Sequence, residues 1–316
     1  MKRIVGSLLL FSLPIAASAF QAEPIAPAAE SPGISISAAA SAGTLNGEAK
    51  EHVFDYETAD GSRRQLSRLD WDLKQIGMAG GQISARVAPK LTINGGLWLA
   101  LTEGSGEMDD YDWLDLSSTE PTHYSLSEVD VTEGYAFDLN LAYDLVRRDG
   151  VIFSALAGYK QNGWTWSDRG VYLLYPEYGP YPIYLNGENL IDYEQEFKMP
   201  YIGASADFAL TGFLLSAYVT YSPMVEATDW DHHIARTIKF KDTFEDGDMI
   251  GAGAEFRYPF KPTVFVIGAI DYQVIDLIVG DMEAYDYSTG ETFFGEGAAG
   301  IENEYVAVTF GVGCHF

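Results

Sequence analysis

The sequence predicts an all-β protein whose strands form a closed, antiparallel, ten-stranded transmembrane β-barrel that extends beyond the outer membrane. Three observations support this fold: a secretory signal at the N-terminus, alternation of apolar with small or polar residues in many segments, and a final strand that ends on Phe316. The composition agrees, because 20 Tyr, 17 Phe and 6 Trp favour strands and 32 Gly disfavour helices.

Residues 1–19 have the features of a signal peptide. Lys2 and Arg3 form a short basic region, residues 4–15 are apolar, and the small residues that end at Ala19 fit a cleavage pattern. The apolar run is too short to cross a membrane as a helix, and no later stretch reaches the ~18 consecutive apolar residues that such a span needs. The sequence therefore predicts secretion and excludes helical membrane spans.

The rest of the chain divides into a leader and a single domain. Residues 20–42 are rich in Pro, Ala and Ser, which predicts a poorly ordered leader. Residues 43–316 carry the alternating segments and form the predicted barrel domain. Cys314 is the one cysteine in the sequence, so no disulfide within the chain can stabilise this domain.

The mature chain is strongly acidic. Loss of residues 1–19 removes two basic residues and leaves 17 Lys and Arg against 46 Asp and Glu, a net charge of −29. Nucleic-acid binding needs basic side chains that neutralise phosphates, so this charge argues against a nucleic-acid partner. It favours cationic peptide or protein partners instead, although solubility alone would also account for it.

Alternation with a period of two is the main evidence for strands. In the last segment six apolar side chains share one face: Val306, Val308, Phe310, Val312, Cys314 and Phe316. A soluble sandwich would bury such a face in a core, whereas a membrane barrel turns it towards lipid. The signal peptide, the lack of a disulfide, the aromatic residues at strand ends and the terminal Phe316 favour the membrane barrel.

The same pattern places ten strands, an even number as bacterial barrels require. They are expected near residues 45–57, 64–78, 82–102, 133–147, 150–167, 190–209, 212–228, 236–258, 262–278 and 301–316. Several exceed the ~9–11 residues that cross a bilayer, so the barrel should project beyond the membrane. The connections near 103–132, 168–189 and 279–300 are dense in Asp, Glu and Tyr, and we expect them on the outer side, where loops carry function.

Two acidic clusters could carry chemistry, and the first lies in the segment Gly106–Asp115. In an extended strand Asp110 and Asp112 point to one face, side by side, with the inward parity of Trp98. Close carboxylates repel each other, so one of the pair tends to hold a proton at a raised pKa. Such a pair can bind and orient a water molecule.

The second cluster is Asp229-Trp230-Asp231-His232-His233. Asp229, Asp231 and His233 share one face, and a carboxylate beside an imidazole orients the ring and raises its basicity, as a general base requires. Set opposite the first cluster, this one could activate a water against a peptide carbonyl without a Ser or Cys nucleophile. From spacing alone, however, a solvated acidic loop is the commoner explanation.

Neither cluster has the pattern of a metal site, so no metal is predicted. Residues 110–121 lack the Gly and the final Glu of a calcium-binding loop. Zinc would need more His or Cys at ligand spacing, and His232 and His233 are adjacent and diverge.

The second cluster also requires an irregularity in its strand. Phe213, Leu215 and Tyr221 are odd-numbered and have the character of lipid-facing residues, yet Asp231 is odd-numbered and should face inwards. A bulge must lie between them, and Pro223 is the expected place because proline interrupts a strand ladder.

At these residues the sequence resembles the omptin family of outer-membrane proteases. The similarity spans almost the whole mature chain, and the order and rough spacing of the matching segments are those of the family. The segments are Gly43–Phe54, Leu66–Leu73, Gly106–Asp115, Glu196–Gly203, Val225–His233 and Gly297–Asn303. Together they are highly specific, although each alone would be weak.

The resemblance implies an aspartate/histidine endopeptidase site at the extracellular top of the barrel. An activated water would cut cationic peptides and proteins after Arg or Lys, without a cofactor. The catalytic residues of the family match Asp110, Asp112, Asp231 and His233. Its acidic pocket for the basic side chain matches Glu51 and Asp229, with Met108 and Ile191 as the apolar wall. Two carboxylates beside an apolar wall suit a guanidinium group and its aliphatic stem.

One departure from the family pattern concerns lipid. Relatives bind lipopolysaccharide, an activating outer-membrane lipid, through basic residues on the outer wall. Two of these positions are Gly163 and Glu196 in this chain. The resemblance therefore puts dependence on that lipid in doubt, or implies contact through other residues such as Lys239 and Lys241.

Two further departures concern the site itself. The residue between Asp231 and His233 is usually Glu in relatives and is His232 here, which is expected to alter the local charge and the pH profile. The acid that shapes the pocket after the cut is replaced near Thr122, so a preference for a second basic residue is not implied.

Two other classes of function fit parts of the pattern. A non-catalytic barrel, acting as an adhesin or a peptide-binding protein, would use the same acidic mouth without cleavage, and a peptide-cleavage assay separates the two. A porin-like channel would conduct ions, whereas ordinary ten-stranded barrels are narrow and filled by side chains. The sequence leaves the physiological substrate and the oligomeric state open.

Overall fold

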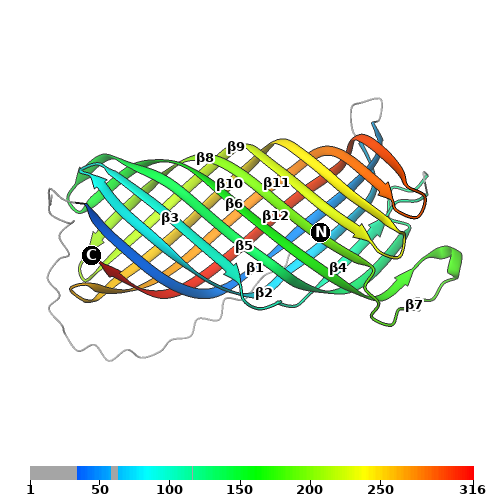
Figure 1. Ribbon diagram of the computed structural model, residues 1–316, viewed down its shortest axis with the longest axis horizontal. Helices are drawn as coiled ribbons and strands as arrows, with labels where there is room; N and C mark the ends of the chain where they lie inside the picture. The colour runs from blue at the N-terminus through cyan, green and yellow to red at the C-terminus, as the bar shows by residue number, and fades with distance from the viewer. Residues whose placement is uncertain (1–33, 58–62, 116) are drawn as a thin grey trace.

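The computed structural model describes residues 34–57, 63–115 and 117–316. The expected signal peptide, residues 1–19, and residues 20–33 of the expected leader lie outside this part of the chain. Within it, no helix is long and apolar enough to cross a membrane. Most of the described chain is strand, arranged as a single barrel of tilted strands (Figure 1).

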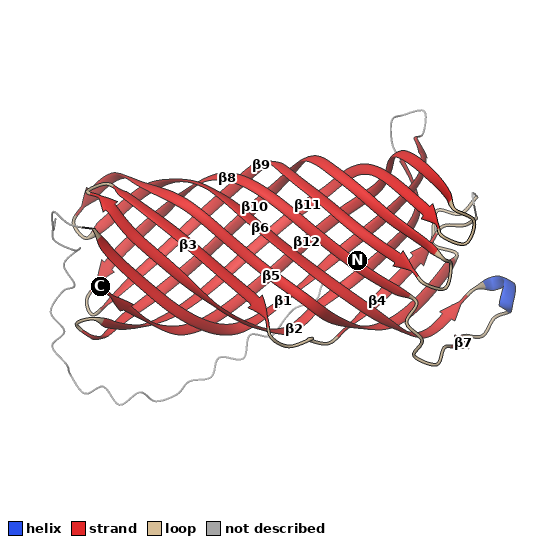
Figure 2. Ribbon diagram, in the orientation of Figure 1, coloured by secondary structure: helices blue, strands red, loops and turns tan. Residues whose placement is uncertain are grey.

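Ten strand positions of the described chain close the barrel in antiparallel order, which confirms the predicted fold. The strands are β1 (Ser35–Glu57), β2 (Arg63–Ala88), β3 (Leu91–Ala100), β4 (Gly106–Asp112), β5 (His123–Arg148), β6 (Val151–Leu174), β8 (Ile191–Leu210), β9 (Phe213–His233), β10 (Ile238–Lys261), β11 (Val264–Asp286) and β12 (Glu291–His315). Strands β3 and β4 share one position, since both pair with β2 and β5, and β12 pairs with β1 to close the ring. Figure 2 shows a short 3-10 helix, Pro176–Tyr178, and strand β7 (Ile183–Tyr184) at one end of the barrel.

The first strand begins earlier than the sequence predicts. Strand β1 starts at Ser35, so residues 35–42 belong to the barrel rather than to a poorly ordered leader. The inward side chains there are Ser37, Ala39 and Ser41, and most of the outward ones are Ala. Because both faces carry small residues, the alternation that marks the other strands is concealed.

The hairpin between β2 and β3 also differs from the expected one. Strand β2 runs through Gly80 to Ala88, and the turn lies at Pro89 and Lys90 rather than near residue 80. A Cβ on Gly80 would come within 2.6 Å of the Trp98 ring, so the glycine lets that ring lie against the backbone. It marks a close approach inside a strand and not a turn.

The outer surface of the barrel has two zones. Near the end that carries the short turns, outward side chains are apolar, among them Leu97, Leu141, Ile202, Val219, Ile250 and Phe310. Towards the other end they are charged, among them Glu48, Lys50, Asp70, Lys198, Glu226, Lys241 and Glu302. Since ~9–11 residues cross a bilayer and β2 and β5 have 26 residues each, the apolar zone fits a transmembrane belt and the charged zone projects into water.

Much of the chain expected to form loops is instead strand in the projecting charged zone. The connection expected near 103–132 contains β4 and the start of β5, and the one near 279–300 contains the ends of the β11–β12 hairpin. Outward charges above the belt remove the contrast between the two faces of a strand, so the sequence pattern there is that of a loop.

The predicted irregularity in β9 is confirmed at Pro223. Below it Ser222 is buried, and above it Val225 and Asp229 are buried, so the inward parity changes from even to odd. Pro223 and Met224 are both exposed, which places the extra residue of the bulge there. This bulge turns the second acidic cluster into the barrel.

Candidate active site

The inner wall of the charged zone carries the predicted site residues. Asp110 and Asp112 lie on β4, and Asp229, Asp231 and His233 lie at the C-terminal end of β9. Strands β4 and β9 lie on opposite sides of the ring, so the two clusters face each other across the barrel interior. The four Asp side chains are at most 7% exposed, which excludes a solvated acidic loop.

Asp231 and His233 form an ion-paired couple. His233 Nε2 lies 2.9 Å from Asp231 Oδ2. The imidazole also packs edge-on against Phe240, with 5.5 Å between the ring centroids. These two contacts hold the ring in one orientation, and a proton on Nε2 shared with Asp231 leaves Nδ1 as the acceptor nitrogen.

Asp110 and Asp112 occupy adjacent inward positions of β4, flanked by β2 and β5. Asp110 is level with Leu69 of β2 and Ser125 of β5. Two hydroxyls contact its carboxylate: Ser67 Oγ donates to Oδ1 at 3.2 Å, and Ser125 Oγ donates to Oδ2 at 3.3 Å. The hydroxyls fix the carboxylate while its remaining lone pairs can accept from water.

The pKa of Asp110 reports its surroundings. Burial and the neighbouring Asp112 raise the pKa of Asp110 to about 7, while the positive charges of Arg236 and His233 oppose the rise. His233 therefore lies within electrostatic reach of Asp110. The structure brings the two predicted clusters together.

Glu51 of β1 meets the second cluster from across the interior. It is 4% exposed, and burial followed by the charges of Asp231 and Asp229 raises its pKa well above the usual range. Burial likewise raises the pKa of Asp229 to about 8, against the effect of a hydrogen bond from Tyr193. Among the described residues, no group of three or more His, Cys, Asp or Glu side chains has the geometry of a metal site.

An aromatic stack lies against these acids. The Tyr193 hydroxyl donates to Asp229 Oδ2 at 3.0 Å. The Tyr193 ring stacks on Trp71 and Trp166, with centroid distances of 5.0 and 5.7 Å. The stack excludes water on this side of the acids, which is why their carboxylates are poorly solvated.

Met108 and Ile191, the predicted apolar wall, pack in the same cluster as that stack. Asp168 fixes the start of β8, because its Oδ1 accepts from the backbone N–H groups of Leu190 at 2.7 Å and Ile191 at 2.8 Å. Its Oδ2 accepts from Ser127 Oγ at 2.8 Å. All eight predicted catalytic and substrate-binding residues therefore converge on the inside of the charged zone.

Comparison with known proteins decides the family. The model described as the Omptin family matches residues 33–316, which include the whole described barrel. The chain belongs to the omptin family. The resemblance stated on the sequence segments is thus confirmed.

Individual omptin relatives agree over nearly the full length. The plasminogen activator of Yersinia pestis is 31% identical over 284 residues, which cover 89% of this chain and 90% of the relative. Protease 7 of Escherichia coli strain K12 is 29% identical over 290 residues, 88% of this chain and 89% of the relative. The crystal structure of the outer membrane protease OmpT from Escherichia coli is similar with a TM-score of 0.83 and 27% identity, covering 91% of this chain and 99% of that chain. The chain is an outer-membrane β-barrel of this family.

One buried acid of the candidate site was not identified from the sequence. Asp242 on β10 is 2% exposed and lies directly opposite Asp229. Burial, followed by the charges of Asp229 and Asp231, raises its pKa to about 9. The sequence contains a signal for this acid, because a short turn that pairs His233 with Ile238 also fixes the register that places Asp242 opposite Asp229.

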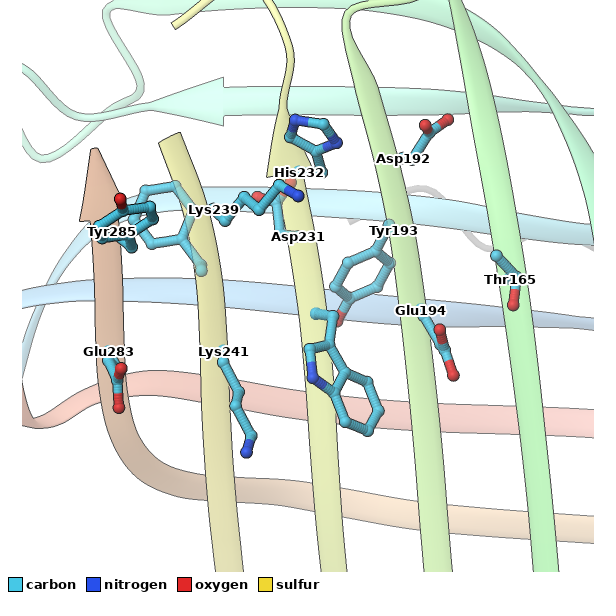
Figure 3. Close-up of a pocket in the computed structure, with 12 residues that line it drawn as sticks. Thr165, Asp192, Tyr193, Glu194, Asp231, His232, Lys239, Lys241, Glu283 and Tyr285 are labelled. Carbon is cyan, nitrogen blue, oxygen red and sulfur yellow. The ribbon is translucent and has the colours of Figure 1, made fainter. Parts of the chain in front are cut away.

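A groove of about 650 Å³ lies on the outer face of the same wall (Figure 3). It is lined mainly by Asp192, Glu194, Trp230, Lys239, Lys241 and Tyr285. His232 also lines it, and His232 Nε2 lies 3.3 Å from the Tyr287 hydroxyl. The His232 side chain thus lies on the outer face, whereas His233 faces inwards, and the expected effect of His232 on the pH profile stays a prediction.

The positions expected to contact lipid have a different chemistry in this omptin. Gly163 and Glu196 are directly paired across β6 and β8, and Glu196 forms an ion pair with Lys198 at 2.9 Å. The alternative basic residues, Lys239 and Lys241, line the outer groove. Dependence on lipopolysaccharide stays a prediction.

Thr122 lies beside the carboxylate pair, in the connection between β4 and β5. Its backbone N–H donates to the Asp112 carbonyl at 2.7 Å, and its Oγ1 lies 2.9 Å from His123 Nδ1. The connection therefore folds back over the end of β4, next to the site. The preference for the residue after the cut stays a prediction.

Proposed function

We propose that this chain is an outer-membrane endopeptidase that cleaves cationic peptides and proteins after Arg or Lys with an activated water molecule. Family membership supports protease activity, because relatives are named Protease 7, outer membrane protease OmpP and outer membrane protease IcsP. The observation that carries the proposal is the Asp231–His233 couple, with 2.9 Å between Nε2 and Oδ2, facing Asp110 across the barrel interior.

Glu51 and Asp229 bind the basic side chain of the substrate. Glu51 Oε2 and Asp229 Oδ1 are buried and have no hydrogen-bond partner among the described residues, so a guanidinium or ammonium group supplies both the donors and the opposite charge. Met108 and Ile191 contact the aliphatic stem of that side chain. The net charge attracts cationic chains to the mouth over a longer range.

His233 acts as the general base towards a water held between it and the Asp110–Asp112 pair. The water oxygen attacks the scissile carbonyl carbon while its proton passes to His233 Nδ1, and Asp231 stabilises the imidazolium. The tetrahedral intermediate then collapses: the C–N bond breaks and the imidazolium returns the proton to the leaving amine. The carboxylate pair orients the water and keeps it against the carbonyl.

We infer that the mouth faces the extracellular side. The charged zone that carries the site projects beyond the apolar belt, and the connection with β7 extends from the same end (Figure 2). Outer-membrane barrels place their longer connections outside and their short turns in the periplasm.

Replacement of the paired residues tests the proposal. Asp110→Ala and His233→Ala should each lower kcat/KM for a fluorogenic Arg-containing peptide roughly a hundredfold or more, because general acid–base catalysis contributes about 10²–10⁴-fold. The matched controls are Asp109→Ala and His232→Ala, the sequence neighbours on the outer face, which should keep activity at the pH optimum of each variant. Folded Asp110→Ala or His233→Ala protein with unchanged turnover would reject the assignment.

A further inference from the structure

Asp242 adds a carboxylate that the proposed mechanism does not use. It faces inwards from β10, is 2% exposed and lies directly opposite Asp229 of β9. Like charges directly opposite each other destabilise a strand pair, and burial disfavours the charged form further. A neutral side chain would pair the strands without either cost, so a role in binding explains the acid better than a role in folding.

Asp242 and the neighbouring acids Glu51 and Asp229 each have a carboxylate oxygen that accepts no hydrogen bond from the described residues. Among the described residues, Glu51 Oε2, Asp229 Oδ1 and Asp242 Oδ1 are buried and have no hydrogen-bond partner. The described chain also places no Lys or Arg in an ion pair with these three acids. Buried polar groups are normally satisfied, so these oxygens indicate a cationic ligand that is rich in donors.

We propose that Asp242 is the third carboxylate of the substrate's cation site, together with Glu51 and Asp229, and that the three acids select the guanidinium of arginine over the ammonium of lysine. The inference rests on the proposed function, in which Glu51 and Asp229 bind the basic side chain. It deepens that function, because it names the residue that distinguishes the two basic substrates.

The positions of the three acids favour an extended cation. Strands β9 and β10 are neighbours, whereas β1 lies across the interior, so Glu51 approaches from a different side than Asp229 and Asp242. A guanidinium is a planar fork with five N–H donors, and it can contact carboxylates on both sides at once. An ammonium concentrates its three donors on one nitrogen, and contact with one side leaves an oxygen on the other without a donor. A site with unpaired buried polar groups discriminates strongly against such a ligand.

Asp242→Asn tests this selection while it keeps the size of the side chain. The assay measures kcat/KM for two fluorogenic peptides that differ only in Arg or Lys before the cut. We expect wild-type protein to prefer the Arg peptide and Asp242→Asn to lose roughly tenfold to a hundredfold on it, the effect of one hydrogen bond to a charged group. The Lys peptide should change little, so the Arg-to-Lys ratio falls. Glu245→Gln, which removes an outward acid of the same strand, should keep the ratio.

A binding measurement separates this inference from the proposed function. Butylguanidinium should raise the unfolding temperature of wild-type protein more than butylammonium does, and Asp242→Asn should abolish the difference. Should wild-type protein cleave neither peptide, the proposed function fails and the binding result alone decides the role of Asp242. An unchanged Arg-to-Lys ratio in Asp242→Asn, or equal binding of the two cations by wild-type protein, overturns the inference.

Discussion

The two acidic walls of the mouth carry the same type of residue in different surroundings. On the β4 wall Asp110 receives two hydroxyl hydrogen bonds, and the charges of Arg236 and His233 oppose the effect of burial, so its pKa rises only to about 7. On the β9–β10 wall Asp229 and Asp242 are buried beside further acids, and their pKa values rise to about 8 and about 9.

All of these acids are buried, so their hydrogen-bond partners distinguish the walls: Asp110 accepts from two hydroxyls, whereas Asp229 and Asp242 each have an oxygen without a donor among the described residues. A carboxylate that accepts from hydroxyls is held in place to orient a water molecule, whereas buried carboxylate oxygens without donors are suited to binding a cation. Asp231 lies on the β9–β10 wall, between His233 and the acids of the proposed cation site. It pairs with His233, and its charge raises the pKa of Glu51.

Replacement of Asp231 should give the largest effect. In Asp231→Asn the amide can neither stabilise the imidazolium nor hold the productive tautomer of His233, so kcat/KM for an Arg peptide should fall roughly a hundredfold to ten-thousandfold. The matched control is Asp192→Asn, since Asp192 lies beside His232 on the outer face as Asp231 lies beside His233 on the inner one. Steady-state kinetics on both variants measures the effect, and activity of Asp231→Asn within threefold of wild type would contradict the role of Asp231 as the partner of His233.

The barrel could be predicted from the sequence wherever one face of a strand meets lipid. Phe310 and Val312 are 67% and 56% exposed, and the residues that alternate with them, Thr309, Gly311 and Gly313, face inwards, as the alternation indicates. Above the belt both faces of a strand are polar, so β4 and the β11–β12 hairpin have the sequence pattern of loops. In residues 35–42 both faces are small, and the start of β1 is equally concealed.

The site could be predicted where its residues lie within one segment. The pairs Asp110–Asp112 and Asp231–His233 are two residues apart, so the period of a strand alone puts each pair on one face. Asp242, in contrast, lies opposite Asp229 only because of the register between β9 and β10. The Ser67 and Ser125 hydroxyls likewise reach Asp110 from two other strands. Register between strands depends on turns and bulges, and a single segment does not contain that information.

The pH dependence of KM should report the β9–β10 wall alone, with an effect smaller than that of Asp231→Asn. Below pH values of about 8 and 9, Asp229 and Asp242 are mostly protonated, so binding of a cation must displace protons. KM for an Arg peptide should therefore fall as the pH rises from 6 to 9, by up to about tenfold per pH unit for each proton displaced. The substrate arginine stays charged throughout this range. Asp242→Asn should flatten the fall near pH 9, whereas a constant KM across the range in wild-type protein would contradict the proposed cation site.

Removal of a single hydroxyl should give the smallest effect, confined to the β4 wall. The Ser67 hydroxyl lowers the pKa of Asp110, because a hydrogen bond to the ionised form stabilises it. In Ser67→Ala that pKa should rise and move the acid limb of the kcat profile upwards by about one pH unit, the size expected when one hydrogen bond to a charged group is lost. Ser67→Thr keeps a hydroxyl and should leave the limb in place.

The same variant also tests whether the two walls titrate independently. The acids of the cation site receive no hydrogen bond from Ser67, so the pH dependence of KM should be the same in Ser67→Ala and in wild-type protein. A shift of the kcat limb with an unchanged KM profile therefore assigns the near-neutral titration to Asp110 and the alkaline titration to the cation site. If both profiles moved together, the carboxylates would titrate as one coupled group, and the contrast between a wall that orients water and a wall that binds the cation would be wrong.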